Sequence, residues 1–212
     1  LAWGMIELYQ TTFEVIWLDR ACELVTGMIE RFADPDLGGF YMTPSDGEQL
    51  LVRSKEIYDG AVASGNSVAC SVLVRLARIT GRLDWEDEAH RLVGAFGERI
   101  AAAPSAHTHL MSALDFLEGP SIEIVLAGDP DSDDLQAMLR TIRSSYVPNC
   151  VVLLRPEPQE DPAVAGPAPW VRDQRSVDGR ATAYVCRDRA CDLPIHDADA
   201  LREALQKPMP PR

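Results

Sequence analysis

The chain has 212 residues, of which 46% are hydrophobic and 25% charged, a composition typical of a globular protein with one large or two small domains. The formal net charge of −13 repels polyanions, so we expect neither nucleic acid nor a membrane as a partner. The apolar runs are short compared with the roughly 20 residues of a bilayer span. Five cysteines, an odd number, indicate a cytoplasmic protein with reduced and mostly buried thiols.

An internal repeat organises the first half of the chain. Residues 1–33 align with residues 69–101 without a gap, and 10 of these 33 pairs are identical, where chance gives roughly two. In both copies, apolar residues recur in steps of three and four, which predicts that each copy is an α-helical hairpin. The identical pairs include Leu8 with Leu76, Trp17 with Trp85, Ala21 with Ala89, Leu24 with Leu92 and Val25 with Val93.

Residues 34–67 connect the two copies. Within them, GGFYMT and QLLVRS predict two short strands around the turn PSDGE, and DGAVASGNS predicts a structured loop before the next helix. In the second copy, we expect Gly81 to end the first helix and Asp84 to cap the second. The first copy begins inside a helix, so we expect the chain to be a piece of a longer protein with further hairpins upstream.

The pattern then changes, which predicts helical hairpins over residues 1–119 and a small α/β region over residues 120–212. SIEIVLAG, DSDDLQAMLRTIRSSY and NCVVLLRP predict a βαβ unit with parallel strands. Residues 156–170 are rich in proline and alanine, which predicts a loop or linker. ATAYVC and CDLPI predict a β-hairpin around the turn RDRA, and a short final helix follows, capped by Asp197 or Asp199.

Two clusters in the sequence could suggest a metal, but neither supplies a full set of ligands. The acids of GDPDSDDL begin like an EF-hand calcium loop but lack its glycine at the sixth position and its glutamate at the twelfth. They fit a helix start instead. His107 and His109 are two positions apart on a predicted helix and do not share a face, so we expect them to face solvent or to cap. The sequence therefore predicts no metal and no cofactor.

The segment KEIYDGAVASGNS gathers the best candidates for a functional site. Carboxylates beside an amide and an aromatic ring are typical of a sugar-binding or acid/base cleft. The same residues also fit a structural loop in which Ser64 or Asn66 caps the next helix, and the residues alone leave both interpretations open. The candidate catalytic residues are Asp59 and Glu56, and the candidate substrate-binding residues are Tyr58, Ser64, Gly65, Asn66 and Ser67.

Cys186 and Cys191 flank the predicted hairpin turn, and His196 follows. A structural zinc site needs four ligands, and a redox pair of the CxxC type has a shorter spacing at a helix start. If the strands pair here, the two cysteines face each other at Cβ separations of about 4.5–5.5 Å, somewhat wide for a disulfide. The spacing favours a reduced structural pair over a reversible disulfide, and both over a metal site.

Four stretches together resemble the spermatogenesis-associated protein 20 family, a group of thioredoxin-domain-containing proteins. They are KEIYDGAVASGNSVACSVLVRLARITG, ALDFLEGPSIEIVLAG, YVPNCVVLL and TAYVCRDRACDLPIHD, in the family's order and over nearly the whole chain. Ala63 stands where the family usually has proline. The resemblance implies a mainly α fold with an α/β C-terminal portion: a partial (α/α)6 toroid, similar to six-hairpin glycosidases, followed by the βαβ and β-hairpin unit.

The resemblance also implies that this is the C-terminal part of a longer protein. Its partners would be an N-terminal thioredoxin-like domain and the remaining barrel hairpins. One function is carbohydrate binding or processing, similar to a glycosidase or sugar epimerase, with Asp59 and Glu56 as acid/base and Asn66 orienting a carbohydrate ligand; the fragment alone would be inactive. The alternative is a non-catalytic scaffold for the redox domain. In a third hypothesis, Cys186 and Cys191 exchange electrons with that domain.

Overall fold

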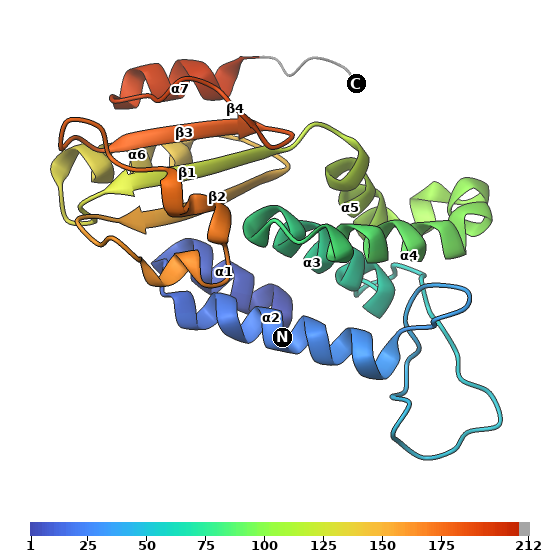
Figure 1. Cartoon of the computed structure of the whole chain (residues 1–212). Coiled ribbons are helices and arrows are strands. Elements are labelled where there is room, and N and C mark those ends of the chain that lie inside the picture. Colours follow the sequence, from blue (N-terminus) through green and yellow to red (C-terminus); the bar gives the residue numbers. More distant parts are fainter. Residues whose placement is uncertain (208–212) are drawn as a thin grey trace. The chain divides into compact units, whose positions relative to one another are not determined.

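The structure is a computed structural model that describes residues 1–207 (Figure 1). These residues form two compact units. The helical unit comprises Leu1–Tyr9, Ile16–Arg78 and Arg82–Gly119, and the sheet unit comprises Gln10–Val15, Ile79–Gly81 and the described residues from Pro120 onward.

The helical unit contains the repeat that the sequence predicted. Both copies are helical, and the helix predicted after them is also present, because apolar side chains at helical spacing give each helix a buried side. The helices are α1 (Ala2–Thr12), α2 (Val15–Phe32), α3 (Gly65–Thr80), α4 (Leu83–Ala102) and α5 (Thr108–Glu118), with a 3₁₀ turn η1 (Pro104–Ala106) before α5. Two hairpins do not close a ring, so the toroid stays a prediction.

The turn between α3 and α4 confirms one predicted cap and corrects the other. Gly81 has a φ of +78°, a conformation that suits glycine at a helix end. The residue before α4 is Arg82, and Asp84 lies inside the first helical turn rather than at the cap. The guanidinium of Arg82 donates to Asp84 (Nε–Oδ1 3.1 Å) and lies over the ring of Trp85 at 3.9 Å. This ion pair occupies the carboxylate that was expected to cap.

The two strands predicted between the hairpins are absent. Met42 N donates to Ser54 O at 2.9 Å, but no ladder joins the two predicted segments. The isolated bridge nearby joins Phe40 to Ala33 instead. Residues 50–52, the apolar part of the second predicted strand, are exposed. A strand needs a surface on which to pack its apolar face, and these side chains have none in the helical unit. The prediction was therefore wrong.

The sheet unit confirms the predicted βαβ unit. Its strands are β1 (Ile122–Gly128), β2 (Cys150–Pro156), β3 (Thr182–Arg187) and β4 (Ala190–Cys191), and its helices are α6 (Asp133–Ser144) and α7 (Ala198–Gln206). The strand order is β2-β1-β3-β4. β1 pairs with β2 in parallel and with β3 in antiparallel orientation. Every residue of β1 is buried, as expected for a central strand.

One face of the sheet carries the main core of this unit. Ile124 and Leu126 of β1 and Val185 of β3 are fully buried there, together with Leu135 of α6 and Leu201 of α7. Alternate residues of a strand point to opposite faces. Glu123 and Val125 of β1 therefore point to the other face, away from this core.

Two details of the sheet unit differ from the predictions. Residues 156–170 are not an open linker, because they include a 3₁₀ turn, η2 (Ala163–Ala165), and lead into another, η3 (Pro169–Asp173), with Val164 and Ala165 buried. The hairpin turn between β3 and β4 has two residues, Asp188 and Arg189, with φ of 47° and 66°, rather than four. A two-residue turn of this kind follows the natural twist of the strands.

The final helix is capped as expected. Asp197 lies at the N-cap of α7, and its Oδ1 accepts from Asp199 N at 3.1 Å and from Ala200 N at 2.8 Å. Across residues 1–207, no helix has both the length and the apolar character that crossing a membrane would require.

Candidate functional site

The side chain of Asn66, in the first turn of α3, joins two loop segments of the helical unit. Its Oδ1 accepts from Phe40 N at 2.7 Å, while its Nδ2 donates to Phe40 O at 2.9 Å and to Glu56 O at 2.8 Å. The side chain therefore pairs with Phe40 much as a neighbouring strand would. Asn66 is buried, and both of its amide hydrogens are used inside the chain.

Asp59 is also buried, and both of its oxygens accept hydrogen bonds from backbone N–H groups. Oδ1 accepts from Ser64 N at 2.8 Å, and Oδ2 accepts from His109 N at 2.9 Å and Leu110 N at 3.1 Å. Asp59 thus caps the N-terminus of α5 from about 50 positions away along the chain. The residue at the N-cap, His107, makes no side-chain cap of its own.

These contacts set the charge of Asp59. Burial raises its pKa, but the backbone N–H of Ser64, the hydroxyl of Ser67 and the two N–H groups at the start of α5 lower it, and the net pKa lies below its ordinary value. A general acid at neutral pH needs a raised pKa. The geometry therefore holds Asp59 as an ionised helix cap.

The other candidates lie around this loop in different environments. Ser64 Oγ accepts from Ser67 N at 3.1 Å, so Ser64 caps α3 as the structural interpretation predicted. Gly65 is exposed, and a Cβ placed on it would meet nothing within 4 Å. The side chains of Glu56 and Tyr58 are exposed, Tyr58 by 63%. The structure therefore turns Asp59 inward and leaves Glu56 and Tyr58 in solvent.

Sequence reasoning missed another carboxylate of the helical unit that makes several bonds, Asp34. It is buried and accepts from Tyr41 Oη at 2.8 Å, from Lys55 Nζ at 2.6 Å and from the backbone N–H groups two and three residues further on, both at 3.0 Å. The Lys55 ammonium, followed by the N–H of Leu37 and the hydroxyl of Tyr41, holds the pKa of Asp34 far below its ordinary value. The signal was present in DPDLGG, because an aspartate before glycines often closes a turn on its own backbone.

Two glycines allow this turn to lie against α4. Gly38 and Gly39 have φ of +77° and +73°. A Cβ on Gly38 would lie 2.5 Å from Arg91 O, and one on Gly39 would lie 2.8 Å from the ring of Phe96. Only glycine fits both the conformation and the space. The buried Asp34, Asp59 and Asn66 and the half-buried Lys55 together form what we call the loop hub, a set of polar side chains that bind backbone.

The two histidines of HTH do not behave alike. His107 is buried, and its Nδ1 lies 2.9 Å from Ile57 O, so the expectation that it faces solvent was wrong; it is the N-cap residue of α5, but its side chain makes no capping bond. The ring of His109 lies 5.1 Å from that of Trp3. Neither meets a second ligand: within residues 1–207, no group of three or more histidine, cysteine, aspartate or glutamate side chains could hold a metal ion.

Cys186 and Cys191 are joined by a disulfide, whereas Cys22, Cys70 and Cys150 form none. The expectation of a reduced pair was therefore wrong. The two-residue turn sets the register so that the two cysteines lie directly opposite each other. Arg187 and Ala190 beside the turn are the hydrogen-bonded pair, which makes the next pair the non-hydrogen-bonded one, where side chains approach most closely.

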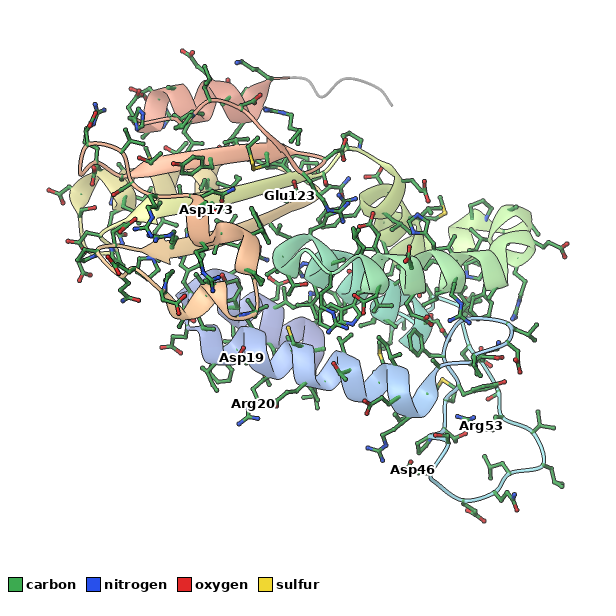
Figure 2. The ribbon with its side chains drawn as sticks, in the orientation of Figure 1. Asp19, Arg20, Asp46, Arg53, Glu123 and Asp173 are labelled. Atoms are coloured by element: carbon green, nitrogen blue, oxygen red, sulfur yellow. A yellow bond between two sulfur atoms is a disulfide. The ribbon has the colours of Figure 1, made fainter. Side chains whose placement is uncertain are left out.

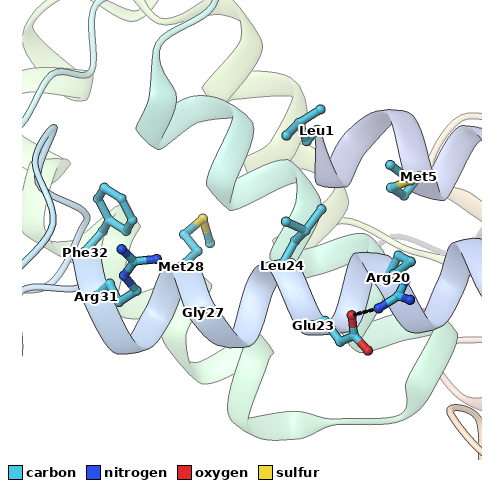
Figure 3. Close-up of a pocket in the computed structure, with 9 residues that line it drawn as sticks. All are labelled: Leu1, Met5, Arg20, Glu23, Leu24, Gly27, Met28, Arg31 and Phe32. Carbon is cyan, nitrogen blue, oxygen red and sulfur yellow. Dashed lines mark hydrogen bonds and ion pairs between the residues drawn. The ribbon is translucent and has the colours of Figure 1, made fainter.

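The helical unit also has a groove of about 550 Å³ along α1 and α2 (Figure 3). Its centre is apolar, and the ion pair between Arg20 and Glu23, with Nη1 and Oε2 2.5 Å apart, lies at its edge. The lining residues are Leu1, Met5, Arg20, Glu23, Leu24, Gly27, Met28, Arg31 and Phe32.

The chain thus combines repeated α-helical hairpins with a small mixed sheet. No family model matches it. It is 35% identical to spermatogenesis-associated protein 20 of Mus musculus over 207 residues, 96% of the chain and 26% of that protein. The proteins of the same name from Rattus norvegicus and Homo sapiens are 34% identical over 96% and 95% of the chain. These similarities support the family resemblance, and the chain spans about a quarter of these relatives' length.

Proposed function

We propose that the chain is a structural segment of a protein of the spermatogenesis-associated protein 20 family, and that the groove on α1 and α2 receives a further α-helical hairpin. The observation that carries this is a difference in burial between identical residues of the repeat. Leu76 and Leu92 are fully buried, whereas their equivalents Leu8 and Leu24 are 40% and 39% exposed. The second copy has a neighbour on this side, and the first copy lacks one within the described residues.

The identical pairs do not all differ in this way. Ala21 and its equivalent Ala89 are both fully buried, and Val25 is fully buried where its equivalent Val93 is half-buried, so the first copy is not the more exposed one at every position. Each unit of a helical repeat buries its outer side against the next unit. Leu24, the exposed leucine that lines the groove, is therefore a position that a further hairpin would cover.

The groove suits such an occupant. Leu24, Met28 and Phe32 extend along one side of α2, at the spacing with which a helix presents an apolar stripe (Figure 3). Charged side chains flank them, as at the rim of a protein interface. The relatives are about four times as long as the matched stretch, which leaves ample chain for further hairpins.

The family resemblance adds two finer possibilities to this proposal. As a scaffold, the helical array would hold a thioredoxin-like redox domain. As a carbohydrate-binding barrel, it would use the loop of Glu56 and Tyr58, whose exposure leaves them available. The scaffold hypothesis is favoured, because Asp59 and Asn66, the residues expected to act on a sugar, form their hydrogen bonds with backbone groups.

The test is binding between this chain and the remaining segment of the mouse relative, measured by isothermal titration calorimetry. We expect binding that Leu24→Glu weakens at least tenfold, because a charge would enter the apolar interface. Leu51→Glu, at a fully exposed loop position, is the matched control and should bind as the unmodified chain does. Absence of binding, or equal weakening by both substitutions, would contradict the proposal.

A sugar panel separates the scaffold from the carbohydrate hypothesis. In thermal denaturation, the scaffold predicts no increase in Tm with any sugar. An increase that Tyr58→Ala removes would favour carbohydrate binding instead, because stacking on an exposed ring is how that residue would contribute.

A further inference from the structure

The disulfide of the sheet unit joins two cysteines with very different access to solvent. Cys186 lies in β3, between β1 and β4, and is 1% exposed. Cys191 lies in the two-residue strand β4 at the sheet edge and is exposed. An attacking thiolate must approach a sulfur in line with the S–S bond, so only Cys191 is open to an outside reactant.

The hairpin tip is held in place by hydrogen bonds that do not involve the disulfide. Asp192 N donates to Val185 O at 3.0 Å, and Arg189 N donates to the buried carboxylate of Glu123 at 3.0 Å. Glu123 belongs to β1 and is labelled in Figure 2. On the other side of the turn, Asp188 N donates to Ser121 O at 3.2 Å. Opening the S–S bond would therefore leave the two sulfurs aligned to close again.

The disulfide is also poorly placed to act as a structural staple. Its cysteines are five positions apart and belong to strands that already pair. A cross-link stabilises a fold mainly by restricting the unfolded chain, and the effect is smallest for short loops. The strand pairing already holds the hairpin together, so the disulfide adds little to its stability.

Two of the other thiols are unsuited to compete in the same chemistry. Burial raises the pKa of Cys70 to about 12, and burial together with the charge of Asp19 raises the pKa of Cys22 to about 11. Thiols react as thiolates, so both are nearly inert near neutral pH. Neither of these two thiols therefore competes with the hairpin pair.

We propose that Cys186 and Cys191 form a reversible thiol–disulfide exchange site that reacts with dithiols through Cys191. One thiolate of the dithiol attacks Cys191 Sγ, the S–S bond breaks, and Cys186 leaves as a thiolate that takes up a proton. The second thiolate of the reductant attacks the reductant's other sulfur, which is now bonded to Cys191 Sγ. This breaks the mixed disulfide, and Cys191 is released as a thiolate and protonated. Two electrons and two protons pass to the protein, and the dithiol becomes a disulfide.

The neighbour of Cys191 supports its role as the leaving group of the second step. Gln174 Nε2 donates to Cys191 Sγ at a distance of 3.7 Å. An amide donor of this kind favours a thiolate over a thiol, since it binds the charged form better. The exposed sulfur is therefore both the accessible one and the one with a donor.

A pair of single variants tests the predicted direction of attack. In Cys186→Ser, glutathione disulfide should form a mixed disulfide with Cys191 at least tenfold faster than it does with Cys186 in Cys191→Ser, as followed by intact-mass spectrometry. The double variant gives the background from Cys22, Cys70 and Cys150. Equal rates in the two single variants, or faster reaction at Cys186, would overturn the assignment of Cys191.

A titration of the unmodified chain tests reversibility. In mixtures of reduced and oxidised dithiothreitol, N-ethylmaleimide labelling should show two thiols appearing together and disappearing again as the ratio is reversed. The circular dichroism spectrum should stay that of the folded chain throughout. Unfolding that accompanies reduction would show a structural disulfide and would overturn the proposal.

Discussion

The helical unit and the sheet unit satisfy their buried backbone groups in different ways. In the sheet unit, the ladder does this, because β1 has a neighbouring strand on each side along most of its length. In the helical unit, the segments between α2 and α3 form no ladder, and side chains replace it. Asn66 bonds to Phe40 across 26 positions, and Asp59 bonds to the start of α5 across 50.

The difference shows where each unit is vulnerable to a single substitution. A ladder distributes its hydrogen bonds over many residues, so the loss of one polar side chain there has a local effect. In the loop hub, one side chain carries several bonds between distant segments, and its loss leaves several buried groups without partners at once. Polar substitutions in the loop hub should therefore cost much more than those at the helix caps of the sheet unit.

The largest effect is expected for Asp59→Ala. Three backbone N–H groups, those of Ser64, His109 and Leu110, lose their acceptor. We expect the free energy of unfolding to fall by about 3 kcal/mol, more than for a single ordinary cap. Urea denaturation followed by circular dichroism measures this.

Asp59→Asn is the matched variant, because it keeps one oxygen acceptor and the shape of the side chain. It should recover a substantial part of the loss. If Asp59→Ala lowered the free energy of unfolding by less than about 0.5 kcal/mol, the level of an ordinary surface substitution, the carboxylate would not be structural. That result would favour a catalytic role instead.

A smaller effect is expected from acid. The pKa of Asp34 is lowered in the folded chain, mainly by the Lys55 ammonium. Such a group binds its proton less readily when folded, so its stabilisation is complete above the unfolded pKa of about 3.9 and is lost as the pH falls through the lower folded value. Unfolding free energy should therefore fall between pH 5 and pH 3. Asp59, whose pKa is also lowered, contributes in the same direction.

The variant Asp34→Asn should flatten this pH profile by about 1–2 kcal/mol. Asp46→Asn is the control in the same loop region, since its ion pair with Arg31 is exposed on both sides and contributes little. Urea denaturation at several pH values compares the two. A profile of Asp34→Asn as steep as that of the unmodified chain would be inconsistent with a strong role for the buried pair.

The sequence predicted the regular elements well, because their signals are local. The apolar periodicity gave the hairpins, the repeat gave their equivalence, and the order of strand and helix gave the βαβ unit. The strands predicted within residues 38–54 failed because a strand depends on a neighbouring surface that composition does not reveal. The disulfide depended on a turn of two residues rather than four, a difference of register that only pairing decides.

The candidate site was predicted in part. Asp59 and Asn66 stood out as polar residues beside a glycine-rich turn, and the structure shows both buried and bonded to backbone groups, while their role in a functional site stays a prediction. What the sequence could not give is the direction in which they point. Whether the carboxylate of Asp59 faces a cleft or backbone N–H groups depends on the position of α5, about 50 positions away. Asp34 and Lys55 were missed for the same reason, because they are 21 positions apart in the sequence.

The smallest effect is expected in the sheet unit, at Asp197→Ala. Its carboxylate accepts from two N–H groups at the start of α7, both within three positions, and it is exposed. Because water can replace it, we expect a loss of about 1 kcal/mol in urea denaturation. Asp199→Ala, which removes only an exposed pair with Arg202, should cost no more than about 0.5 kcal/mol. If Asp197→Ala lowered the free energy of unfolding as much as Asp59→Ala, neither burial of the carboxylate nor its sequence separation from its partners would distinguish the two caps. The contrast between the units would then fail.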